Sequence, residues 1–188
     1  MKPSSQPGTR NPKPGTLIIT RIGVLLGLTL AFQSLGLPQP VTGTFVNCVL
    51  FLSAALFGPW TAVAVGCLTP FPALLLGQLP PPLWPFLPVI AAGNILLVLV
   101  FHAFRRLRFI PKKPAGRLAD AIAVFPAACV KFAWLAAAVT WWMPLLLGRA
   151  VPVQAAAALA SPQLFTAMAG GAAAVLILPT MLQVLHIR

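Results

Sequence analysis

The chain alternates long apolar stretches with short segments that carry most of its basic, polar and proline residues. A helix that crosses a bilayer needs about 20 largely apolar residues. Six stretches approach or exceed that length: residues 16 to 36, 42 to 58, 60 to 78, 86 to 104, 119 to 147 and 162 to 185. The second is short and the fifth is long, which indicates tilt or a partly buried end. The pattern predicts an all-α bundle of about six transmembrane helices over residues 16 to 188, after a basic, proline-rich tail over residues 1 to 15.

The composition agrees with a protein built for lipid. Of 188 residues, 59% are hydrophobic and only 7% are charged, which is far too little charge for the surface of a water-soluble domain. The formal net charge is +12, but the basic residues are spread between apolar stretches and form no basic surface of the kind that binds nucleic acid. We interpret them as a signal of membrane topology.

The distribution of lysine and arginine predicts the orientation of the helices. Basic residues near helix ends are retained on the cytoplasmic side. With six spans, Arg149 is alone on one side and all the other basic residues outside the spans fall on the opposite side. These are Lys2, Arg10, Lys13, Arg105, Arg106, Arg108, Lys112, Lys113, Arg117 and Arg188. Both termini are therefore predicted to be cytoplasmic, and the proline-rich connection at residues 78 to 85 is predicted to face outward, as a lid or as a plain rigid turn.

Few polar side chains occur inside the predicted spans, and they concentrate in the outward half. Lys131 lies near the middle of the fifth span, whereas Asn47, Asn94, Gln33 and Gln163 lie in the outer parts of four others. A polar group in hydrocarbon is costly unless it has a partner or faces a wet cavity. The residues therefore predict a polar cavity that opens outward with one buried cation at its floor.

Such a cavity would bind a small molecule. Lys131 would neutralise an anionic group, Asn47 and Asn94 would hydrogen-bond a polar ring, and Trp134, one helical turn from Lys131, could stack on a flat ligand. Other roles stay open: Lys131 could be a structural partner of a backbone carbonyl or an asparagine, or could snorkel, and each asparagine could simply join helices. Asp120, the only acid, is expected to pair with the neighbouring Arg117.

Small residues recur every fourth position on the first span. Gly23, Gly27 and Ala31 would form a flat face where another backbone can approach closely. That face could dock a partner protein or could pack within the chain. A second pattern, Ala62 and Gly66, lies on the third span.

Motifs for catalysis are missing from the sequence. There is no G-x-x-x-x-G-K-[ST] phosphate loop, no H-E-x-x-H, no nucleophile elbow and no pair of acids, so the chain can neither use ATP by itself nor run acid–base chemistry. The three cysteines form no C-x-x-C pair or cysteine–histidine cluster. No enzymatic activity, cofactor or metal site is expected.

Several of these features together resemble one family. The small residues on the first span, the segment Pro40-Val-Thr-Gly-Thr-Phe-Val-Asn47, and Phe57-Gly-Pro59 followed by Ala62 and Gly66 are similar to the substrate-binding S component of energy-coupling factor (ECF) transporters. The resemblance covers residues 16 to 185.

The resemblance implies a function. A protein of this family in the plasma membrane of a prokaryotic cell would bind a vitamin or micronutrient from outside. It would dock through Gly23, Gly27 and Ala31 on a membrane coupling subunit that two cytoplasmic ATPases drive. Gln39 and Thr42 map to the first outer loop, which often closes over ligand. The acid that many relatives carry after the Gly66 position is replaced here by Cys67-Leu-Thr69, so the ligand's identity does not carry over. The alternatives are a membrane scaffold or assembly protein and a solitary carrier that needs no ATPase.

Overall fold

The computed structural model describes residues 14–79, 81–107, 116–159 and 161–185. Within these residues the chain is helical, with no strand, which confirms the all-α prediction. Most of the predicted cytoplasmic basic residues lie outside the described part: Lys2, Arg10, Lys13, Arg108, Lys112, Lys113 and Arg188.

The helices follow the predicted stretches closely. Five runs among the described residues are long and apolar enough to cross a membrane. The fifth predicted stretch is one continuous run in which a π-helical turn joins two α-helices. The elements are α1 (Pro14–Gln33), α2 (Gln39–Phe57), α3 (Pro59–Leu68), α4 (Pro70–Leu75), η1 (Pro81–Phe86), α5 (Leu87–Arg105), α6 (Gly116–Ala137), η2 (Ala138–Trp142), α7 (Met143–Leu147), α8 (Val153–Leu159) and α9 (Ser161–Val184).

The third predicted stretch is interrupted and shorter than expected. Helix α3 ends at Leu68, and α4 follows directly after Thr69 with proline at both position 70 and position 72. Proline removes a backbone donor and clashes with the preceding turn. Gly77 then turns the chain at a φ of 70°, a value that glycine adopts without strain. The run Pro59–Leu75 is therefore too short to count among the five runs that could cross a membrane.

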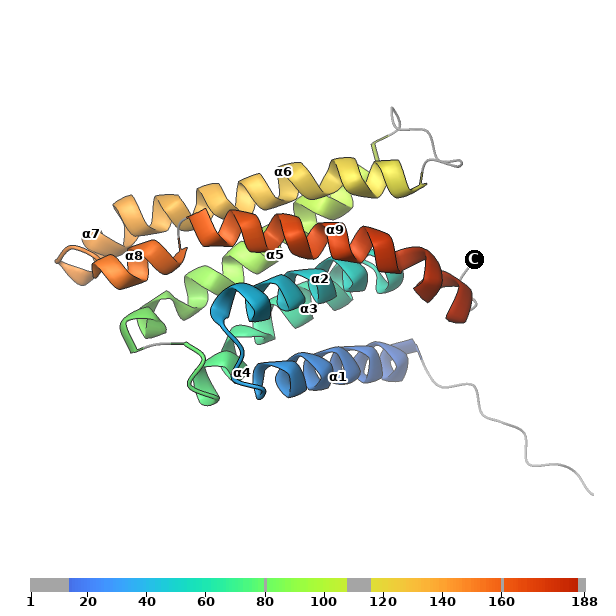
Figure 1. The fold of residues 1–188 in the computed structure, drawn as a ribbon, viewed down its shortest axis with the longest axis horizontal. Coiled ribbons are helices and arrows are strands. Elements are labelled where there is room, and N and C mark those ends of the chain that lie inside the picture. Colours follow the sequence, from blue (N-terminus) through green and yellow to red (C-terminus); the bar gives the residue numbers. More distant parts are fainter. Residues whose placement is uncertain (1–13, 80, 108–115, 160, 186–188) are drawn as a thin grey trace, which may run out of the picture.

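The two ends of the bundle differ in what they hold. The start of α1, the end of α5, the start of α6 and the end of α9 lie together at one end, on the right in Figure 1. We call this the basic end, because it includes Arg105 and Arg106. Elements α4, η1, α7 and α8 lie at the opposite end, on the left in Figure 1, which we call the loop end. Six spans likewise place the start of the first helix and the end of the last at the same end of the bundle.

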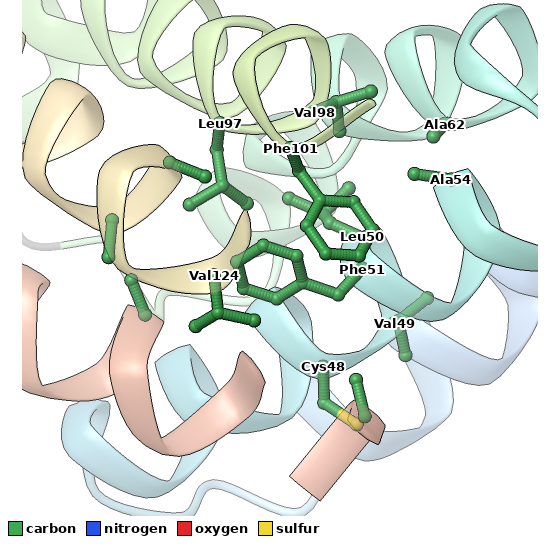
Figure 2. Packing of buried hydrophobic residues seen from close by; sticks show 14 of the residues in the cluster. Cys48, Val49, Leu50, Phe51, Ala54, Ala62, Leu97, Val98, Phe101 and Val124 are labelled. Atoms are coloured by element: carbon green, nitrogen blue, oxygen red, sulfur yellow. The ribbon is translucent and has the colours of Figure 1, made fainter. Parts of the chain in front are cut away.

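An apolar core fills the bundle toward the basic end. Helix α2 packs along α9, and α5 packs along α6. Phe51 of α2 and Phe101 of α5 meet edge to face, with ring centroids 4.8 Å apart, a preferred geometry for aromatic pairs. Leu50, Leu97 and Val98 surround them, as Figure 2 shows. A second apolar cluster, which includes Leu83, Phe86, Leu135 and Leu159, occupies the loop end.

Two adjacent glycines let α9 approach its neighbours. A Cβ atom on Gly170 would lie 2.6 Å from the backbone oxygen of Thr44 and 2.8 Å from Cβ of Asn47. A Cβ on Gly171 would collide with Val124 of α6. Only glycine permits this spacing, which is a common device for packing helices in membranes. The contact brings α9 against the part of α2 that carries Asn47.

Candidate functional site

Lys131 is buried between the two apolar clusters. It lies one turn after Ala127 and one turn before Leu135 on α6, so all three share one helix face. Its side chain is 3% exposed. A charged group at such a place is tolerated only with partners.

Two asparagines supply those partners. Lys131 Nζ donates to Oδ1 of Asn47 at 2.7 Å and to Oδ1 of Asn94 at 2.8 Å. An ammonium group has three donors and no acceptor, so the two amide oxygens must face it. One N–H remains after these two hydrogen bonds. Both asparagines are themselves buried, at 1% and 2% exposed.

Each asparagine is oriented by a partner on a further helix. Asn47 Nδ2 donates to Oγ1 of Thr166 on α9 at 3.3 Å, and that hydroxyl donates to the backbone oxygen of Gln163 at 3.2 Å. Asn94 Nδ2 donates to the backbone oxygen of Gly66 on α3 at 3.1 Å. Because the amide nitrogens are occupied in this way, both amide oxygens point at Lys131. The network joins α2, α3, α5, α6 and α9.

The chain provides no counter-charge for Lys131. Its only acid is Asp120, eleven residues earlier on α6 and therefore about 16 Å away along the helix. Asp120 forms an ion pair with Arg105 of α5; the side chain of Arg117, its expected partner, lies outside the described residues. Arg105 faces Asp120 across the α5–α6 contact, a proximity that sequence spacing does not reveal. Within the described residues, the hydrogen-bond partners of Lys131 are therefore two neutral amides.

Lys131 forms part of the wall of a cavity at the loop end. The cavity has a volume of about 80 Å³ and is partly open to the outside, so it is smaller than the roughly 300–1,000 Å³ of most small-molecule sites. Asn47, Asn94 and Lys131 come from the middle parts of α2, α5 and α6 and form one polar end. The other polar residues of the wall come from helix ends and connections: Gln33, Gln39, Thr42, Thr69, Gln78 and Gln163.

The predicted ligand residues therefore share one cavity, with a single exception. Lys131, Asn47, Asn94, Gln33, Gln39, Thr42 and Gln163 all line it. Trp134 is not among the lining residues. Its indole nitrogen donates to the backbone oxygen of Val89 at 2.9 Å, and its ring packs where a Cβ on Gly93 would lie, 3.3 Å from Cδ1. Trp134 thus turns toward α5.

Gln33 has an acceptor without a partner. Its side chain is 3% exposed, and Oε1 accepts no hydrogen bond within the described part of the chain. Its backbone oxygen accepts from Nε2 of Gln78 at 2.9 Å, so the proline-rich connection is tied to the end of α1. An unmade hydrogen bond at a buried acceptor costs about 1–3 kcal/mol. The side chain of Gln33 is therefore suited to receive a donor from a molecule in the cavity.

Sequence reasoning missed several residues of the site. Thr166 orients Asn47 although it does not line the cavity, and its only sequence signal is its position one turn after Gln163 on the same helix. Gln78, Leu79 and Leu83 of the proline-rich connection form part of the wall. The proline content indicates a lid or a rigid turn, but the contact of this connection with Gln33 depends on how α4 turns back, which the sequence does not indicate.

The small-residue face of α1 is open. Gly23, Gly27 and Ala31 are exposed, and a Cβ on either glycine would meet nothing within 4 Å. Ala62 and Gly66 differ: Ala62 is fully buried, and a Cβ on Gly66 would lie 3.2 Å from Cβ of Asn94. The pattern on α3 thus packs within the bundle, whereas packing within the described chain does not account for the pattern on α1.

Comparison with known proteins places these features in context. A family model described as "ECF transporter, substrate-specific component" matches residues 18–182, which is nearly all of the chain. Comparison with curated proteins and comparison with solved structures each gave no match.

Proposed function

The chain belongs to the family of substrate-specific components of ECF transporters, and from this premise we propose that it captures a small, vitamin-like anion in the Lys131 cavity. Members of the family are binding subunits for transport and not enzymes. The chain would take its ligand from outside a prokaryotic cell, with both termini in the cytoplasm.

The observation that carries the proposal is the pairing of Lys131 with two neutral amides inside a cavity. Asn47 and Asn94 hold the ammonium in place at 2.7 and 2.8 Å but provide no negative charge. A buried charge without an opposite charge is costly. An anionic ligand that accepts the third N–H of Lys131 would supply both the charge and the hydrogen bond.

The partners follow from the family. ECF transporters combine a substrate-specific component with a membrane coupling subunit and two cytoplasmic ATPases, and we assign the open face of Gly23, Gly27 and Ala31 to the coupling subunit. Small residues let a second helix approach closely. No other helix of the described chain covers this face.

Extraction and uptake test this function together. The purified protein is denatured, and small molecules released from it are identified by mass spectrometry. Uptake of that compound is then measured in cells that express the chain with the coupling and ATPase subunits. We expect one compound and ATP-dependent accumulation, absent when the catalytic lysines of the ATPases are replaced.

The same measurements separate the alternatives. An extract with no compound, together with no accumulation of vitamins in cells, would support a membrane scaffold. Accumulation by cells that express the chain alone would support a solitary carrier. Either result would contradict the proposed role.

A further inference from the structure

The walls of the cavity differ from those of a site for a flat ring. Among the described residues that line it, none is aromatic; its apolar part is formed mainly by the aliphatic side chains of Val46, Leu79, Leu83, Ile90 and Leu159. Flat heteroaromatic ligands gain much of their affinity by stacking on aromatic side chains. Trp134, the residue predicted to stack on a ligand, hydrogen-bonds Val89 and is not among the lining residues.

Two polar groups at different places in the cavity wall have opposite hydrogen-bonding roles. In the middle of the helices, Lys131 presents a cationic donor. At the end of α1, Gln33 presents a buried oxygen to which no described residue donates. The described residues that line the cavity include no carboxylate, so a cationic ligand would find no counter-charge among them. A molecule that satisfies both ends needs an anionic acceptor on one side and an N–H or O–H group on the other.

We propose that the ligand is an aliphatic monocarboxylate with a hydrogen-bond donor at the end remote from its acid. Its carboxylate binds Lys131, its aliphatic body lies against the leucine, isoleucine and valine walls, and its N–H or O–H donates to Oε1 of Gln33. This inference rests on the proposed function, since it names the chemical class of the molecule that the Lys131 cavity takes.

Equilibrium binding to the purified full chain tests this with matched probes. Pantothenate and biotin are aliphatic acids with distal O–H or N–H donors; panthenol and biotinol replace each carboxylate by an alcohol. Octanoate keeps the acid and lacks the donor, and nicotinate is a flat aromatic acid. We expect one of the two donor-bearing acids to bind about tenfold to a hundredfold more tightly than its own alcohol. It should also bind more tightly than octanoate and nicotinate.

Substitutions of Lys131 and Gln33 test which residue binds each end of the ligand. Lys131→Met should abolish the preference for acid over alcohol, and Lys131→Arg should retain part of it. Gln33→Leu should lower affinity for the donor-bearing acid about two- to tenfold and leave octanoate binding unchanged. Gln183→Leu is the matched control, because Gln183 is exposed near the end of α9 and lines no part of the cavity.

The order of the probe affinities for the wild-type protein tests the inference even if a variant fails to fold. Tighter binding of an alcohol or of nicotinate, or no binding of either donor-bearing acid, would overturn the inference. So would a Lys131→Met protein that keeps the acid preference. If the protein purified from membranes still carries some other compound in that case, the proposed capture function stands and only the ligand class is wrong. If it carries none, both fail.

Discussion

Thr166 on α9 accepts a hydrogen bond from Nδ2 of Asn47 on α2, with the two atoms 3.3 Å apart. The bond leaves Oδ1 of Asn47 to face Lys131 on α6. A residue that does not line the cavity thereby determines how the cavity presents its cation. The close approach of α9 and α2 at Gly170, one turn after Thr166, makes the hydrogen bond possible.

Replacing Thr166 tests this orienting role. Thr166→Val keeps the shape of the side chain but removes the acceptor, so Asn47 is free to rotate. We expect the free energy of unfolding to fall by about 0.5–1.5 kcal/mol, measured by denaturant titration in detergent micelles. Thr166→Ser is the control and should behave as wild type. Equal stability of the valine variant and wild type would show that the hydrogen bond does not hold the two helices.

Replacement by alanine should have opposite effects on stability at Gly170 and at Gly27. Gly170→Ala places a Cβ 2.6 Å from the Thr44 backbone oxygen, and because backbone cannot yield cheaply, we expect a loss of about 1–3 kcal/mol. Gly27→Ala meets nothing within 4 Å and should change stability by at most about 1 kcal/mol, in the stabilising direction. The same titration measures both. A Gly170→Ala protein as stable as Gly27→Ala would contradict the packing described here.

The broad fold could be predicted because lipid imposes a simple rule. Every span must be apolar over a set length, so hydropathy alone indicates where α1, α2, α5, α6 and α9 lie. Polar residues in such spans must meet one another or a cavity, which is why the sequence alone groups Lys131 with Asn47 and Asn94. The break between α3 and α4 was not predicted, although Pro70 and Pro72 carry a signal for it.

What could not be predicted depends on contacts between distant segments. Trp134 follows Lys131 by three residues, yet its ring turns to Val89 because a backbone oxygen there accepts its N–H. Asp120 pairs with Arg105 across helices, although a basic neighbour stands three residues away in sequence. The sequence alone does not distinguish Gly170 and Gly171 from other glycines. Their role in packing is evident only once the positions of α2 and α6 are known.

The exposed face of α1 predicts a defect confined to assembly. Gly27→Leu places a bulky side chain where the coupling subunit would approach, and we expect copurification with that subunit and the ATPases to fall about tenfold. The stability and ligand content of the isolated chain should not change, because the position is open. Ala172→Leu, at an exposed alanine of α9, is the matched control and should assemble normally. Equal assembly of both variants would remove α1 as the docking face.

The ion pair at the basic end predicts a stability effect that is separate from binding. Asp120→Asn removes the carboxylate that pairs with Arg105, which also lies over the ring of Phe101. Arg105 is partly exposed, so the loss should be modest, about 1–3 kcal/mol. In a double-mutant cycle with Arg105→Gln, the two losses should not add. Additive losses would mean that the pair contributes nothing to holding α5 against α6.

The most direct test of the account is the ligand occupancy of three proteins purified in parallel and measured by native mass spectrometry. Wild type should carry one small molecule per chain, Lys131→Arg should carry it at reduced occupancy, and Lys131→Met should be empty while still unfolding cooperatively. That result would place the ligand's acid on Lys131. A folded Lys131→Met protein with the same compound at wild-type occupancy would contradict the account and leave Lys131 as a structural link between α2, α5 and α6.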